Sequence, residues 1–459
     1  MRKKKLIILL LVFVILIAIG AALFIFLPAK ANKVDLNLSK DIPALAYKSL
    51  YKIVDDSAEY NLYITQLGSS HQEVDSDISY FYVDHNGEFL AYAVKDSDIM
   101  DNYFYLMSPQ GDRTLITKDG SYFKMAYDQN EMCYTSKKEP DSLFVVKFDS
   151  QARITGKKEL TVEDSDFKDY NFSAGVGLFM KNFRSGQEGA FDDDSVNPYD
   201  YNWGDIYECT ASGTPQKIAE KAFCSGVGQS ISNDGSVVFI ANCDEKTKTG
   251  DLYLKTANGE PKLLKENASN RFAISPNGQL VAAIVKGENN EAELVYQFYG
   301  KEAREVGNVI DFKISQDSGT LVYLANTGDK NRQAIYSMTG DSQPVLLTDN
   351  AVFIQEVSED GKTIAYLANY NEKSLTGDLY VAKAGEEPYY IDTGVFLSSV
   401  ILNFDTPTIN LSSDGLYIAY LKNLHEDRLY GDLYLAKVGD KSQLIEQNVS
   451  TGFDFFGGS

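Results

Sequence analysis

The sequence contains few of the residues that build metal centres and catalytic triads. Its 459 residues include four cysteines, three histidines and one tryptophan. No two cysteines form a CxxC pair, and the histidines His71, His85 and His425 are far apart in the chain. Zinc sites use closely spaced cysteines and histidines, and a Ser-His-Asp triad needs a histidine beside its nucleophile. These counts argue against both kinds of centre.

Sequence signatures of cofactor chemistry are absent as well. The chain has no P-loop and no dinucleotide-binding fingerprint. Its nearest approach to the nucleophile elbow GxSxG is GQSIS at 228–232, which lacks the second glycine. The sequence therefore predicts no catalytic residue and no bound cofactor, and it favours a protein that is not an enzyme.

The charge balance excludes nucleic acid as a partner. The chain carries 43 basic and 65 acidic residues. Five of the basic residues and none of the acidic ones lie in the first thirty positions, which leaves 38 basic and 65 acidic residues in the remainder. A body this acidic repels phosphate backbones and anionic lipid surfaces.

One long apolar segment lies near the N-terminus. Residues 6–27 contain no charged side chain, and 22 residues of helix span roughly 33 Å, about the thickness of a bilayer core. Four basic residues precede the segment, so the positive-inside rule places the N-terminus in the cytoplasm. We predict a single-pass protein of the cell membrane with a cytoplasmic stub at 1–5, a transmembrane anchor at 6–27, a linker at 28–44 and an extracytoplasmic body at 45–459. The alternative is cleavage near AKA at 29–31, which gives a secreted protein.

A seven-residue word recurs along the chain. It is GDIYECT at 204–210, GDLYLKT at 250–256, GDLYVAK at 377–383 and GDLYLAK at 431–437. Two apolar stretches joined by a Ser-x-Asp-Gly turn precede the last three copies, and such a turn joins two strands of a hairpin. We predict that Gly-Asp lies in the turn that opens a third strand, with Leu and Tyr on opposite faces of that strand.

These elements define an antiparallel unit of four strands, called A to D. The A–B turns recur at intervals of about 42 residues, which is typical of β-propeller blades. We predict an all-β fold, a β-propeller of about eight four-stranded blades, after one N-terminal transmembrane helix. Nine blades are an alternative, because 45–77 can supply strands B to D of one more unit and 450–456 its strand A. Seven are an alternative if a weak copy is misassigned.

The repeat resembles the WD40-like PD40 repeat of TolB-type propellers. The resemblance rests on ISPNGQLVAAIV at 274–285, VSEDGKTIAYLAN at 357–369 and LSSDGLYIAYLKN at 411–423. It covers 225–450 closely and 80–225 more loosely. The resemblance implies a propeller fold and no single function, because such propellers serve as scaffolds, receptors and gating domains. The chain departs from TolB in having no separate N-terminal α/β domain.

Two insertions stretch the repeat, and both are predicted at the same end of the ring. One spans 184–205 between strands B and C, and the other spans 393–407 before a strand A. Long loops on a rigid scaffold commonly carry function. The candidate binding residues are Asp192, Asp193, Asp194, Tyr199, Asp200, Tyr201, Trp203 and Phe404. Such aromatic and acidic side chains suit a protein, peptide or glycan partner or a calcium ion, and they also suit a plain solvated loop.

Two functions of different classes fit this sequence. The first is a membrane-tethered extracytoplasmic scaffold that binds a protein, peptide or glycan without catalysis. The second is a propeller enzyme, a lyase or hydrolase of extracellular glycan or peptide, that uses carboxylates at the central channel. The lack of any nucleophile and base signature favours the first.

Cys224 and Cys243 flank the turn at 232–235. If Ser232 lies opposite Ser236, the two cysteines fall within one residue of direct opposition on strands A and B. A disulfide needs a small bulge there, and outside the membrane nothing keeps thiols reduced. A disulfide and two buried thiols are therefore both compatible with the sequence.

Overall fold

The computed structural model describes residues 33–456 with internal gaps. The description excludes 1–32, 37, 40–41, 55–56, 85–86, 96–101, 126–129, 141, 162–169, 174–175, 185–202, 211–214, 223–229, 245–246, 248, 288–290, 317–318, 330, 398–407, 426–429 and 457–459. Every helix or strand in the described part is a β-strand. The prediction of an all-β fold is therefore confirmed for this part of the chain.

The strands follow one another in short antiparallel steps. In chain order they are β1 (Ala44–Val54), β2 (Ser57–Thr65), β3 (Gln72–Asp75), β4 (Ile78–Val83), β5 (Leu90–Lys95), β6 (Asn102–Met107), β7 (Arg113–Met125), β8 (Glu131–Ser136), β9 (Ser142–Phe148), β10 (Ile154–Thr161), β11 (Tyr170–Ser173), β12 (Val176–Arg184), β13 (Trp203–Thr210), β14 (Gln216–Ala222), β15 (Val237–Asp244), β16 (Thr249–Lys255), β17 (Lys262–Ile274), β18 (Leu280–Lys286), β19 (Ala292–Phe298), β20 (Arg304–Gly307), β21 (Val309–Ile314), β22 (Thr320–Ala325), β23 (Gln333–Thr339), β24 (Val345–Ala351), β25 (Phe353–Val357), β26 (Thr363–Asn371), β27 (Thr376–Lys383), β28 (Tyr389–Phe396), β29 (Ile409–Leu411), β30 (Tyr417–His425), β31 (Tyr430–Lys437) and β32 (Gln443–Phe456).

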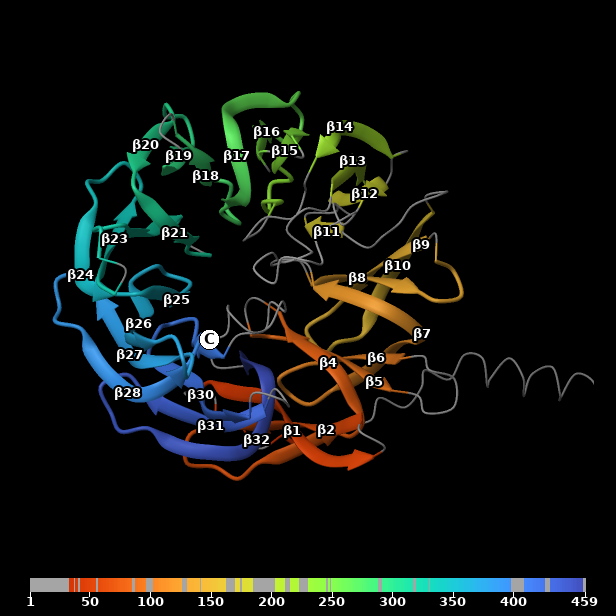
Figure 1. Ribbon diagram of the computed structural model, residues 1–459. Helices are drawn as coiled ribbons and strands as arrows, with labels where there is room; N and C mark the ends of the chain where they lie inside the picture. The colour runs from red at the N-terminus through yellow and green to blue at the C-terminus, as the bar shows by residue number, and fades with distance from the viewer. Residues whose placement is uncertain are drawn as a thin grey trace, which may run out of the picture.

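The described strands form nine blades around a ring (Figure 1), and eight of the blades have four strands each. Blade 1 combines the end of β32 with β1–β3, and the others are blade 2 (β4–β7), blade 3 (β7–β10), blade 4 (β11–β14), blade 5 (β15–β17), blade 6 (β17–β20), blade 7 (β21–β24), blade 8 (β25–β28) and blade 9 (β29–β32). Among the described residues, strand A of blade 5 is represented by one bridge, from Ile231 to Val237. The main prediction of eight blades is wrong, and the alternative of nine is correct.

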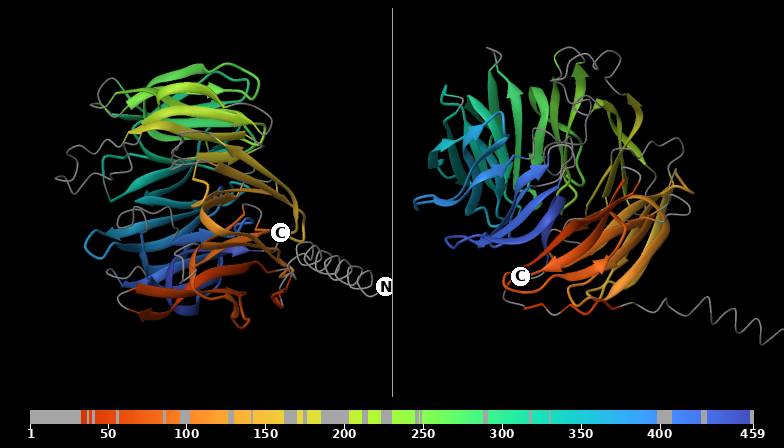
Figure 2. Two further views of the ribbon diagram at one scale, coloured as in Figure 1. Left: turned by 90° about the vertical axis from the view of Figure 1, so that its right-hand side faces the viewer. Right: turned by 60° about the horizontal axis from the view of Figure 1, so that its bottom comes forward.

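The two ends of the body close the ring together. The tail of β32 is strand A of blade 1 and pairs antiparallel with β1, with Ala44 opposite Phe456 and Tyr47 opposite Phe453. The first strands, in red and orange, accordingly lie beside the last ones, in blue, in Figures 1 and 2. Residues 45–77 supply strands B to D of this blade, as the nine-blade alternative requires. The closing blade therefore contains both ends of the body.

Three long strands pass from one blade to the next without a loop. β7, β17 and β32 each serve as strand D of one blade and continue as strand A of the following one. Asn267 in β17 and Asn448 in β32 have positive φ where the strand changes partner. Asparagine adopts such values more readily than most residues, so it suits the bend.

The Gly-Asp pair of the repeated word lies inside strand C and not in a turn, which corrects the prediction. Gly377 sits beside strand B, where a Cβ atom would lie 2.8 Å from the Ala368 carbonyl oxygen. The strand B residue at this bulge is Asn369, which has φ 49° and donates a hydrogen bond of 2.8 Å to Asp378. The same bond joins Asn242 to Asp251 and Asn423 to Asp432. Gly-Asp recurs because each copy forms this bulge.

Leu and Tyr of the repeated word pack into different interblade cores, as predicted. Leu379 is buried in a core shared by blades 8 and 9, whereas Tyr380 packs against the core shared by blades 7 and 8. Tyr380 also stacks on Tyr366 of strand B, with ring centroids 5.5 Å apart. Besides the core between blades 8 and 9, buried clusters of the same kind join seven other pairs of neighbouring blades, and blades 7 and 8 are one of these pairs. Hydrophobic burial between blades therefore holds the ring together.

The antiparallel order gives the ring two unlike ends. A–B and C–D turns lie side by side at one end, which we call the turn end. In blade 6 the backbone N–H of Tyr299 in the C–D turn donates to the Gln279 carbonyl in the A–B turn, and in blade 9 Val438 donates to Leu416 in the same way. B–C loops and D–A connections lie at the opposite end, which we call the loop end. A ligand that approaches along the ring axis meets one of these two ends.

The predicted linker is partly docked on the propeller. Lys33 pairs with Asp112, and Val34, Leu36 and Leu38 pack on the core between blades 1 and 2. Residues 6–27 lie outside the described residues, so the transmembrane anchor stays a prediction. In the described part of the chain, no helix has the length and apolar character needed to span a membrane.

Candidate functional site

Both insertions leave the ring at the loop end, as predicted. The first connects β12 to β13, which are strands B and C of blade 4, and the second connects β28 to β29, which are strand D of blade 8 and strand A of blade 9. β28 continues to Phe396, so the second insertion is shorter than its predicted span of 393–407. The candidates Asp192, Asp193, Asp194, Tyr199, Asp200, Tyr201 and Phe404 lie outside the described residues, and Trp203 is the first residue of β13.

The calcium and disulfide predictions stay untested. No group of three or more His, Cys, Asp or Glu side chains suited to a metal occurs among the described residues, but the acidic loop at 192–200 is not among them. Cys224 also lies outside the described residues, while Cys243 is near the end of β15 with its sulfur 4.0 Å from the Ile240 carbonyl oxygen. The assumed register is confirmed, because Ser232 donates to Ser236 across the turn at 2.9 Å.

Charged side chains of the innermost strands pair between neighbouring blades. Arg271 of blade 6 meets Asp311 of blade 7 at 2.8 Å, and Lys313 of blade 7 meets Glu356 of blade 8 at 3.6 Å. These strands border the centre of the ring in Figure 1. Each of these two carboxylates therefore faces a cation from the adjacent blade.

Asp454 differs from these carboxylates because the side chain that hydrogen-bonds to it is neutral. The side-chain amide of Asn410, on strand A of blade 9, donates a hydrogen bond of 2.7 Å to Asp454, and the Phe455 backbone N–H donates one of 2.9 Å. Burial raises the pKa of Asp454 to about 7, and the charges of Glu356 and Asp84 act in the same direction. Asp454 is the described carboxylate at the centre of the ring best suited to exchange a proton near neutral pH.

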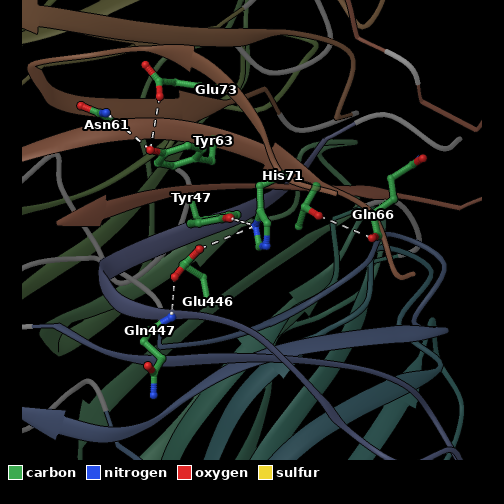
Figure 3. Close-up of polar contacts among 9 residues, drawn as sticks. Tyr47, Asn61, Tyr63, Gln66, His71, Glu73, Glu446 and Gln447 are labelled. Atoms are coloured by element: carbon green, nitrogen blue, oxygen red, sulfur yellow. Dashed lines mark hydrogen bonds and ion pairs between the residues drawn. The ribbon is translucent and has the colours of Figure 1, made fainter. Parts of the chain in front are cut away.

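A second polar cluster lies at the seam between blades 9 and 1 (Figure 3). His71 Nδ1 contacts the hydroxyl of Tyr47 on β1, and it lies 3.9 Å from a carboxylate oxygen of Glu446 on β32. Burial raises the pKa of Tyr47, and the nearby Glu446 charge raises it further. The phenol therefore stays neutral. The residues brought to His71 here are a tyrosine and a glutamate, and no serine nucleophile is among them.

The seam repeats a contact found at other blade boundaries. Tyr420 of blade 9 donates to Asp392 on the outer strand of blade 8 at 2.7 Å, and Lys422 reaches the same carboxylate at 2.9 Å. Tyr92 of blade 2 lies 3.4 Å from Asp75 of blade 1, which also binds Arg113 at 2.6 Å. A strand B tyrosine thus approaches an acidic residue of the preceding blade in each case. The Tyr47 cluster is therefore explained by packing between blades.

Comparison with solved structures finds a similar overall fold. The chain matches a structure titled as the eukaryotic initiation factor with a TM-score of 0.56 and 8% identity, over 90% of this chain and 98% of the other. It also matches TolB from Acinetobacter baumannii (TM-score 0.31, 14% identity, over 73% of this chain and 81% of the other) and a structure whose title names two prolyl endopeptidases (TM-score 0.43, 12% identity, over 82% and 50%). The first likeness shows a shared fold and nothing about shared function.

Comparison at the sequence level adds no relative. No family model matches the chain, and no curated protein matches it. The function must therefore be argued from the residues of this chain.

The pairs at the centre of the ring were not found from the sequence. A signal for them exists: Lys313, Glu356 and Asn410 each lie two residues before the serine that opens an A–B turn, namely Ser315, Ser358 and Ser412. The position two before that serine therefore marks one ring of polar groups on neighbouring strands. The pairing of these polar residues depends on the order of the blades around the ring. The repeat gives that order only after the blades are counted correctly.

Proposed function

We propose that this protein is a membrane-tethered extracytoplasmic β-propeller that acts as a non-catalytic binding scaffold. Residues 6–27 are its anchor, and its partner is a protein, peptide or glycan outside the cytoplasm. The repeat's resemblance to the PD40 repeat of TolB-type propellers agrees with a binding role. The acidic body and the loops at the loop end fit a partner that is not a nucleic acid.

One observation carries this proposal. At the centre of the ring, where a propeller enzyme would place its acids, Asp311 and Glu356 each pair with a cation of the adjacent blade. The described histidine at the seam, His71, packs against Tyr47 and Glu446. Within the described residues, these groups stabilise contacts between blades and form no nucleophile–base pair.

Orientation is tested by protease added to intact protoplasts. We expect the protease to digest the body and to leave only a short membrane-protected fragment that contains 6–27, because the positive-inside rule places the body outside. A body that survives until the cells are lysed contradicts the orientation. A mature N-terminus near Ala31 contradicts the anchor and indicates a secreted protein.

Binding is tested by removing the first insertion. We expect deletion of 187–201 to leave the unfolding midpoint nearly unchanged and to weaken capture of the partner from solubilised membranes, because the loop lies outside the blades. A Gly/Ser loop of equal length is the matched control for loop closure, and it should bind as weakly as the deletion. Undiminished capture, or a much lower melting temperature, contradicts this role for the loop.

A lyase or hydrolase is the second candidate, and the raised pKa of Asp454 is the observation that favours it. A general acid works best with a pKa near the ambient pH. If the protein is this enzyme, purified material will cleave extracellular glycan or peptide, and Asp454→Asn will abolish the cleavage. Equal turnover by Asp454→Asn and the unchanged protein contradicts catalysis by this residue.

A further inference from the structure

The N-terminal end of the described chain is fixed to one end of the ring. Val34 donates a backbone hydrogen bond of 2.9 Å to the carbonyl of Gly111, in the C–D turn of blade 2. Gln66, in the C–D turn of blade 1, accepts from the Ser39 backbone N–H at 2.7 Å and donates to the Ser39 carbonyl at 2.8 Å. The described residues between Lys33 and Pro43, which we call the strap, therefore run along the turn end of blades 1 and 2.

The strap is held by shape as well as by hydrogen bonds. A Cβ atom on Gly111 would lie 1.9 Å from the Val34 carbonyl oxygen, so only glycine allows this approach. Val34, Leu36 and Leu38 are partly buried against the core between blades 1 and 2. The described contacts of the strap with the propeller begin at Lys33 and not at the start of β1. Between this point and the apolar segment 6–27 lie only residues 28–32.

This short spacing limits how the ring can stand on a membrane. Six residue steps separate position 27 from Lys33, and an extended chain covers roughly 3.4 Å per residue, so the strap lies within roughly 20 Å of the end of the apolar segment. The strand D part of β7 between Arg113 and Lys118 separates the turn end of blade 2 from its loop end by roughly 17 Å. If the loop end faced the bilayer, the tether would have to be almost fully extended to cover this distance, whereas it can stay slack when the turn end faces the bilayer. The tether therefore favours the turn end.

We propose that the strap holds the turn end of blades 1 and 2 against the lipid surface, so that the loop end of the ring faces away from the membrane and is the surface open to an extracytoplasmic partner. This inference rests on the proposed anchor at 6–27. Both insertions leave the blades at this open end. A partner of the scaffold thus approaches from the side opposite the bilayer.

Energy transfer to the membrane surface tests the orientation. The full-length chain is reconstituted in vesicles that carry an acceptor-labelled lipid in the outer leaflet, with a fluorescent amino acid in place of Gln110 or Lys118. Both positions are exposed and belong to blade 2, but Gln110 lies at the turn end and Lys118 at the loop end. We expect higher transfer efficiency from position 110, because transfer falls steeply with distance. Equal transfer, or higher transfer from position 118, overturns the proposal.

Two glycine variants show whether the strap causes the difference. Gly111→Ala removes the close approach to Val34, and Gly68→Ala is its matched control. Gly68 also lies in a C–D turn, with φ +79°, but a Cβ atom added there would have no other atom within 4 Å. We expect Gly111→Ala to lose most of the difference between positions 110 and 118, and Gly68→Ala to retain it. If both variants retain it, the strap does not orient the ring.

A variant with a longer tether tests the same proposal if Gly111→Ala fails to fold. Inserting a long Gly/Ser segment between Asn32 and Lys33 should likewise abolish the difference, because a flexible linker of that kind behaves as a random coil. A difference that survives the insertion contradicts the proposal. Failure of the anchor itself is seen separately, because the chain then stays in solution and does not float with the vesicles.

Discussion

The asparagine–aspartate contact at the start of strand C is the residue-scale feature that recurs through the ring. Asn242, Asn369 and Asn423 each have positive φ and each donate to the aspartate of the repeated word. Asparagine tolerates this backbone conformation, and the aspartate accepts the bond that stabilises it. The neighbouring glycine leaves room for the carbonyl of strand B. Three residue types are therefore explained by one bulge.

We expect Gly377→Ala to lower the free energy of unfolding by about 1–3 kcal/mol. The new methyl group would lie 2.8 Å from the Ala368 carbonyl oxygen, so one strand must shift. Gly156→Ala is the matched control in a strand, because there the methyl group meets only Lys147 Cβ at 3.8 Å. Denaturant unfolding of both variants measures this. A loss of stability in Gly156→Ala as large as that in Gly377→Ala contradicts the steric explanation.

Asp454 should make stability fall as the pH rises towards neutrality. Its pKa is about 7 in the folded protein, against about 4 in an unfolded chain. The folded state thus holds the proton more tightly, so the stabilisation is complete below about pH 4 and is lost as the pH rises through about 7. We expect Asp454→Asn, which keeps an oxygen acceptor, to remove this slope and to add roughly 2 kcal/mol at pH 8 relative to the unchanged protein.

Unfolding curves between pH 4 and pH 8 measure this effect. The difference in unfolding free energy between Asp454→Asn and the unchanged protein should grow in favour of the variant as the pH rises. A difference that stays constant over this range means that Asp454 titrates alike in the folded and unfolded protein.

At the scale of strands, the closing blade depends on the tail of β32. Phe456 is fully buried in the core between blades 1 and 2, whereas Leu444 on the same strand is 48% exposed. We expect Phe456→Ala to lower the free energy of unfolding by about 3–5 kcal/mol and Leu444→Ala to change it by no more than about 0.5 kcal/mol. Thermal or denaturant unfolding measures both. If Phe456→Ala is as mild as Leu444→Ala, the tail does not close the ring as described.

Much of the strand pattern could be predicted from the sequence, because each blade repeats one packing problem. The period gave the four-stranded unit, and Leu379 and Tyr380 were correctly expected on opposite faces of strand C. The count of eight left out the blade that 45–77 and the tail at 450–456 form together. The sequence offered this split blade only as an alternative, because its strands lie at opposite ends of the body. The Gly-Asp pair was misplaced because glycine favours both turns and close strand contacts, and sequence alone does not separate them.

At the scale of the whole molecule, contacts between distant segments could not be predicted from the sequence. The pairs Lys313–Glu356 and Asn410–Asp454 join strands about 43 positions apart, and the strap joins residues such as Val34 and Gly111. Such contacts depend on how the blades are ordered and where the ring closes. The repeat gives the order of the blades, but the choice of partner or ligand depends on loops that lie outside the repeat.

We propose that the loop end of the ring is the partner-binding surface of a tethered scaffold. Site-specific photo-crosslinking in intact cells tests this most directly, with the full-length chain carrying a photoreactive amino acid in place of Tyr199 in the first insertion or of Gln110 at the turn end. We predict a discrete protein or glycan adduct from position 199 that is absent from position 110. Equal adducts from both positions, or an adduct from position 110 alone, contradict the account.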